Sequence, residues 1–156
     1  MSKSLKRVTR ALHDAGLNIA PLEMAADTRT AGQAAAQAGC ALDQIAKSII
    51  FRGERSGLPL LFITAGGNQV DAAKATALAG EAMGKADADL IRAHTGFAIG
   101  GVAPVGHLAP TRAFIDPRLF DFGTIWAAAG TPRHIFPISP ADLERISDAQ
   151  RADFIA

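Results

Sequence analysis

Residues 95–107 combine four glycines, a proline and a histidine with an otherwise apolar run. Isolated glycines weaken an ordinary strand, so a cluster of them needs a cause, such as a positive φ or the close approach of a ligand to bare backbone. Pro104 removes one backbone donor and fixes its own φ. We therefore predict a rigid, open loop with free backbone amides and one polar side chain, His107, at its end. Such a loop is typical of a site for an ester or an anion.

Length and composition indicate a folded globular chain. We expect residues 1–156 to form a single domain, because this length is enough to bury a core without dividing. The hydrophobic fraction of 49% and the charged fraction of 20% argue against disorder. The single cysteine, Cys40, excludes an internal disulfide and gives no basis for a cysteine zinc site. We expect neither a metal nor a cofactor.

Charge and hydropathy point to the cytoplasm. The basic start of the chain is followed by His13 and Asp14, where a signal peptide would have a continuous apolar region. No apolar run approaches the length of a membrane span, so we expect no membrane association. The net charge of +1 is too small for a protein that grips duplex DNA, but it is compatible with contact to the end of a nucleic acid.

Apolar spacing and capping residues predict an α+β fold. Thr30, Asp71 and Ser139 are expected to cap helices, and Pro140 suits a first helical position. The predicted helices cover residues 5–15, 31–38, 71–78, 87–94 and 140–146. The predicted strands cover residues 18–24, 47–52, 58–65, 112–115, 124–128 and 133–138. Because some strands are joined by hairpins, we expect a mixed, mainly antiparallel twisted sheet flanked by helices rather than a doubly wound parallel sheet.

The first predicted helix presents a basic face. Lys3, Lys6, Arg7 and Arg10 share its polar side. Such a face is most often solvated, and contact with RNA is the alternative.

Three segments of the chain carry a resemblance: residues 44–51 with Lys47, the loop with Gly100 and Pro104, and residues 127–132. In this order they resemble the lysine strand, the GxxxP loop and the second small-residue loop of the YbaK / prolyl-tRNA-synthetase-associated family of aminoacyl-tRNA deacylases. The similarity runs from about residue 28 to residue 146. It implies a YbaK-like editing domain with a partly barrel-like sheet.

Lys47 is one candidate for the site. From its pattern alone, it would be an ordinary outward-facing lysine at the start of a strand, because an unpaired ammonium is costly in a core. The resemblance implies instead the lysine of the editing pocket. There it would anchor the terminal adenosine of the tRNA, or its ester, by charge.

The glycine-rich loop is the complementary candidate. Ester hydrolysis builds negative charge on the carbonyl oxygen, and backbone amides aimed at that oxygen stabilise it. We expect these donors near Gly100, Gly101 and Val102. The alternative interpretation is a tight turn that merely requires glycine.

His107 is a tempting general base, because its ordinary pKa lies near physiological pH. The resemblance implies a pocket-wall residue that orients the substrate. Ala128 stands where the Cys-tRNA(Pro) deacylase branch has a serine, so cysteine specificity is not implied. The substrate-binding candidates are Thr30, Val102, Pro104, His107, Ala128 and Gly130.

The sequence gives little support for a serine nucleophile or for a pair of catalytic carboxylates. The chain has no G-x-S-x-G motif and no evident carboxylate pair. Asp43, Gln44, Ser48 and Asp71 are expected to face solvent or to cap helices.

The resemblance, together with these observations, implies a free-standing trans-editing enzyme. It would hydrolyse the ester bond of a mischarged aminoacyl-tRNA, tRNA(Pro) carrying a small amino acid. Its partners would be the 3′ end of that tRNA and, as a candidate, prolyl-tRNA synthetase. The alternatives are a non-catalytic module or synthetase adaptor that binds an aminoacyl end or a nucleotide, and a hydrolase of esters without tRNA.

Overall fold

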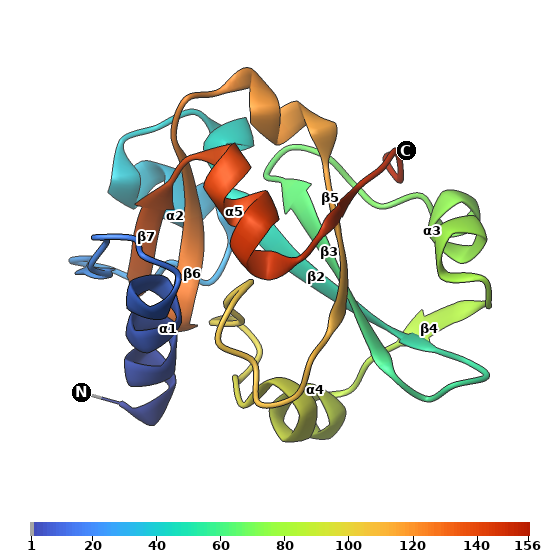
Figure 1. Ribbon diagram of the computed structural model, residues 1–156. Coiled ribbons are helices and arrows are strands. Elements are labelled where there is room, and N and C mark those ends of the chain that lie inside the picture. The colour runs from blue at the N-terminus through green and yellow to red at the C-terminus, as the bar shows by residue number, and fades with distance from the viewer. Residues whose placement is uncertain (1) are drawn as a thin grey trace.

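Two β-sheets form the framework of the computed structural model, which describes residues 2–156 (Figure 1). The larger sheet has the strand order β4-β2-β3-β5-β8, and the smaller has the order β1-β7-β6. The strands are β1 (Leu22–Glu23), β2 (Ala46–Gly53), β3 (Pro59–Ala65), β4 (Met83–Lys85), β5 (Arg112–Ile115), β6 (Ile125–Thr131), β7 (His134–Ile138) and β8 (Gln150–Arg151). The helices are α1 (Lys3–Asp14), α2 (Ala31–Ala38), α3 (Ala72–Ala79), α4 (Ala88–Thr95) and α5 (Pro140–Ser147), with 3-10 turns η1 (Leu42–Gln44) and η2 (Pro117–Asp121).

The larger sheet is mixed. β2 pairs antiparallel with β3 and β4, whereas β3 with β5 and β5 with β8 are parallel pairs. Both pairs of the smaller sheet are antiparallel. The predicted α+β class with a mainly antiparallel, mixed arrangement is therefore confirmed. The single sheet is in fact two open sheets, which meet at a bridge between Ile45 and Trp126.

Local capping signals located the helices well. Thr30 accepts a hydrogen bond from the Gln33 amide, and the Gln33 side chain accepts one from the Thr30 amide. Gly39 ends α2 in the left-handed region at φ +68°. Asp71 and Ser139 also cap the helices predicted for them.

The edges of the sheets were the weaker part of the prediction. The strand expected at residues 18–24 is only β1, and the short strands β4 and β8 were not expected. Strands of two or three residues show no alternation that a sequence could reveal. Residues 127–132, expected as a loop, lie mostly in β6, whose register shifts between Ala128 and Thr131.

Two apolar layers hold the larger sheet. On one side, Val8 and Leu12 of α1 pack into the main core with Phe136 of β7. On the other side, Phe62 is fully buried beneath α3. Its ring centre lies 5.8, 5.2 and 5.1 Å from those of Phe51, Phe114 and Phe154, respectively.

We predict that Phe62→Ala lowers the free energy of unfolding by about 3–5 kcal/mol, because it removes a buried ring and leaves a cavity among three aromatic neighbours. Leu58→Ala is the control, since that side chain is 57% exposed and should cost under about 0.5 kcal/mol. Denaturant unfolding measures both variants. A Phe62→Ala cost as small as that of the control would contradict this packing.

Candidate functional site

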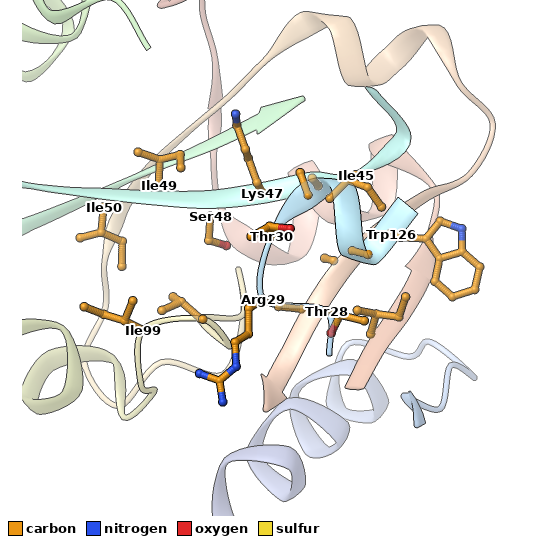
Figure 2. Close-up of a pocket in the computed structure, with 18 of the residues that line it drawn as sticks. Thr28, Arg29, Thr30, Ile45, Lys47, Ser48, Ile49, Ile50, Ile99 and Trp126 are labelled. Carbon is orange, nitrogen blue, oxygen red and sulfur yellow. The ribbon is translucent and has the colours of Figure 1, made fainter. Parts of the chain in front are cut away.

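A cavity of about 400 Å³ lies where α2, the first half of β2, the glycine-rich loop and β6 meet (Figure 2). Its volume is within the range usual for small-molecule sites. Most of its walls are aliphatic. These apolar residues are Ala31, Ala34, Ile45, Ala46, Ile49, Ile50, Ile91, Ile99, Val102, Ala127, Ala128 and Ile135. No carboxylate or histidine of residues 2–156 lines it.

The segment before α2 forms one wall. Thr28 is buried, and both its amide and its hydroxyl donate to the Pro132 carbonyl, at 2.7 and 3.1 Å. Thr30 lines the cavity while its hydroxyl oxygen accepts the Gln33 amide. This wall is therefore tied both to α2 and to the turn between β6 and β7.

Lys47 lines the edge of the cavity. Its side chain leaves β2 on the face opposite to Ser48 (Figure 2), and Nζ donates to the Gly66 carbonyl at 3.2 Å. Burial lowers the pKa of this ammonium, and the charges of Asp43 and Asp116 partly oppose that effect. Lys47 thus lies at the edge of the cavity, but its ammonium group is on the other face of β2, near the carboxylates of Asp43 and Asp116.

The glycine-rich loop forms a second wall through Gly100 and Val102. Gly100 has a φ of +94°, which favours glycine, and a Cβ there would contact the Arg29 methylenes from 3.4 Å. Within residues 2–156, the Gly100 and Val102 amides have no protein acceptor. The Gly101 amide, the third expected donor, instead donates to the Ala98 carbonyl at 3.1 Å. Gly101 is buried against the backbone of Thr131.

Pro104 and His107 lie away from this cavity, beside a separate one of about 340 Å³. His107 Nε2 donates to the Ala103 carbonyl at 2.6 Å, because that oxygen can only accept. Nδ1 is hydrogen-bonded to the Thr111 hydroxyl at 2.8 Å. The His107 ring therefore stabilises the glycine-rich loop from the side of the second cavity.

Of the two residues predicted in the small-residue segment, Ala128 and Gly130, only one lines the cavity. Ala128 lines the cavity, whereas Gly130, at φ +94°, lies beneath α1. A Cβ at Gly130 would lie 3.0 Å from the Phe97 ring and 3.1 Å from the Ser4 backbone. This glycine allows α1 and the glycine-rich loop to approach β6.

Arg7 holds the loop in place. Its guanidinium donates to the carbonyls of Gly96, at 2.9 Å, and Gly106, at 3.2 Å. It also lies 5.0 Å from the centre of the Phe97 ring, within cation–π range. The solvated or RNA-contacting role expected for this side chain is wrong, because Arg7 is half-buried and its donors are used within the protein.

Several residues that line the cavity were not predicted from the sequence, among them Arg29, Trp126 and Ser48. Arg29 and Trp126 line the cavity, and Arg29 forms an ion pair with Asp27 at 3.5 Å. Ser48, expected to face solvent or to cap, lies with its Oγ buried and without a partner. Strand alternation was the available signal, because an outward Lys47 places Ser48 on the inner face.

The other polar neighbours behave more conventionally. Asp71 caps α3, and the Gln44 side chain accepts the Ala41 amide. Asp43 accepts hydrogen bonds from Arg118 and from the Gly67 amide, and both hold the pKa of its carboxyl below the ordinary value.

No group of three or more metal-binding side chains gathers within residues 2–156. No helix among these residues is both long and apolar enough to cross a membrane.

The fold and site define an α+β domain with an apolar cavity beside a glycine-rich loop. The chain belongs to the aminoacyl-tRNA editing domain family, whose model matches residues 25–146. It is 30% identical to Bacillus subtilis YwhH over 125 residues, covering 80% of this chain and 79% of that protein.

Solved structures agree with this assignment. A crystal structure described as a candidate trans-editing enzyme for prolyl-tRNA synthetase is 42% identical, with a TM-score of 0.92 over 100% of this chain and 99% of that one. The hypothetical protein APE2540 is 25% identical, with a TM-score of 0.88 over 96% of this chain and 99% of that one. The expected family and fold are thereby confirmed.

We predict that His107 makes stability depend on pH. Burial lowers its pKa below the ordinary 6.5, so just below pH 6.5 the unfolded chain binds more protons than the folded one. This contribution to stability is present above about pH 6.5 and is lost as pH falls through the folded-state pKa. His107→Gln should flatten that dependence in denaturant unfolding measured across the pH series, whereas His13→Gln, at an exposed position of α1, should not. Equal pH dependence in wild type and His107→Gln would contradict the assignment.

Proposed function

We propose that this chain is an aminoacyl-tRNA deacylase that acts in trans on a mischarged tRNA, tRNA(Pro) carrying a small amino acid. The observation that carries the proposal is the meeting of free loop amides and a mainly aliphatic cavity at Gly100 and Val102. An aminoacyl group fits such a cavity, and its ester carbonyl would lie against the loop. The description of the 42%-identical structure as a candidate trans-editing enzyme for prolyl-tRNA synthetase supports an editing role linked to that synthetase.

The reaction requires water to add to the ester carbonyl carbon. The carbonyl oxygen then becomes an oxyanion, which accepts hydrogen bonds from the Gly100 and Val102 amides. Collapse of this intermediate breaks the bond to the ribose oxygen, which leaves with a proton, and releases the free amino acid and the tRNA. Each preorganised donor of this kind is worth roughly 10²–10³ in rate.

The ammonium group of Lys47, at the edge of the cavity, binds the end of the nucleic acid, and uncharged residues surround the aminoacyl group. Lys47 anchors the terminal nucleotide by exchanging its bond to the Gly66 carbonyl for an oxygen of the substrate. Thr30 and Ala128 form walls around the aminoacyl group. Pro104, His107 and Gly130 act indirectly, by fixing the loop that carries the amides.

The alternative is a module that binds an aminoacyl end without turnover. The absence of a carboxylate or histidine from the lining within residues 2–156 is the observation that favours it. Turnover of a charged tRNA separates the two functions.

We expect the protein to hydrolyse tRNA(Pro) charged with alanine, serine, threonine or cysteine faster than Pro-tRNA(Pro), with or without EDTA. Lys47→Ala should abolish this turnover while changing the melting temperature little, because its proposed role is to bind substrate. Lys74→Ala is the matched control, since Lys74 forms an exposed ion pair with Asp153. Hydrolysis of none of these esters would refute the proposed function, and full activity of Lys47→Ala would refute the anchor.

Gly101→Ala tests the loop. Its new Cβ would lie 2.9 Å from the Thr131 carbonyl carbon, so the loop must shift and carry the neighbouring amides away from the ester. We expect a rate loss of about a hundredfold in single-turnover deacylation. Gly123→Ala is the control, because a Cβ there meets no atom within 4 Å. Equal rates in the two variants, both folded by thermal melts, would contradict the backbone-driven mechanism.

A further inference from the structure

Ser48 is the exception among the buried polar side chains. Within residues 2–156, its Oγ is the one buried side-chain oxygen or nitrogen without a hydrogen-bond partner. The nearby cavity hydroxyls have partners, since Thr28 donates to Pro132 and Thr30 accepts from Gln33. A buried hydroxyl without a partner destabilises the fold, and an alanine would serve β2 equally well. The fold therefore gives no reason for a hydroxyl at this position.

The side chain points into the cavity. Ser48 leaves β2 on the face that Ile50 shares, toward Thr30, Arg29 and Ile99 (Figure 2). Lys47 and Ile49 point to the other face. Ser48 therefore belongs to the lining of the cavity, with its buried Oγ on the cavity side of β2.

The surrounding walls indicate which group of the substrate this hydroxyl reads. An α-ammonium has three donors and favours carboxylates, but no carboxylate of residues 2–156 lines the cavity. A substrate hydroxyl has one donor and can accept in turn, so it matches a serine hydroxyl one to one. Alanyl and prolyl groups would leave Oγ buried and unpaired.

We propose that Ser48 selects an aminoacyl group with a side-chain hydroxyl, seryl or threonyl, by hydrogen bonding to it in the cavity. The proposal rests on the deacylase function proposed above. A site built to bond a hydroxyl rejects an analogue without one far more strongly than an apolar wall rejects a missing methyl group.

The test measures single-turnover deacylation of seryl-, threonyl-, alanyl- and prolyl-tRNA(Pro) by the wild type, Ser48→Ala and Ser48→Thr. The wild type should hydrolyse the seryl ester at least about tenfold faster than the alanyl ester. Ser48→Ala should lose about tenfold on the seryl ester and stay within about twofold on the alanyl ester. Ser48→Thr should retain the preference, and Ser56→Ala, in the exposed turn after β2, should match the wild type.

A second readout separates recognition from a structural role. Ser48→Ala should melt at the same temperature as the wild type or higher, because it removes a buried hydroxyl that has no partner. A lower melting temperature would make Ser48 a structural residue and overturn the proposal. So would equal rate losses on all four esters, or no change on any of them.

The two proposals fail differently. If the wild type hydrolyses some of the four esters but shows no preference for seryl or threonyl, only the role of Ser48 is refuted. If it hydrolyses none of them, and cysteinyl-tRNA(Pro) is not hydrolysed either, the deacylase function is refuted and the role of Ser48 with it.

Discussion

The backbone of the glycine-rich loop forms no ladder with a neighbouring strand, so other groups must hold it in place. Arg7 binds the carbonyls of Gly96 and Gly106, and His107 binds the carbonyl of Ala103. All three bonds use carbonyl oxygens, and the amides of Gly100 and Val102, two residues that line the cavity, have no protein acceptor within residues 2–156. When a loop is held through its carbonyl groups, its N–H groups stay free and already have a fixed orientation before a ligand binds. The position of the proposed oxyanion donors depends on this arrangement.

The first helix is therefore part of the site, although it lies outside the matched family segment of residues 25–146. Val8 and Leu12 bury its apolar face in the main core. Burial of those side chains sets the rotation of α1, and the rotation places Arg7 over the loop. Gly130 makes the close approach possible, because any side chain there would meet Phe97 and Ser4. Core packing and loop geometry are thus coupled through one helix.

Local signals in the sequence were sufficient for the helices and for the glycine-rich loop, since caps and positive-φ glycines act within a few residues. Pairings between distant segments were not predictable in the same way. The apolar run at residues 58–65 marks a buried strand, but it does not identify β5 as the parallel neighbour of that strand. The same limit applies to Arg7 and His107. Helical spacing placed Arg7 on a polar face without showing that the loop covers that face, and the resemblance placed His107 near a pocket without showing on which side.

Lys47 and Ser48 are neighbours in β2 but have different surroundings, because side chains alternate between the two faces of a strand. Adjacent residues point to opposite faces, so Lys47 meets Asp43 and Asp116 while Ser48 enters the cavity. A slip of one residue would put the ammonium among aliphatic walls and the hydroxyl beside the carboxylates. Asp116 holds the end of β3 in place, because its buried carboxylate accepts hydrogen bonds from the amide of Ala65 and from the side chain of Asn68. Ala65 pairs with Ala46 at the start of β2, so this carboxylate anchors the end of β3 with which the start of β2 is paired. A buried acid that does not itself line the cavity thus supports the part of the hairpin from which Lys47 and Ser48 project.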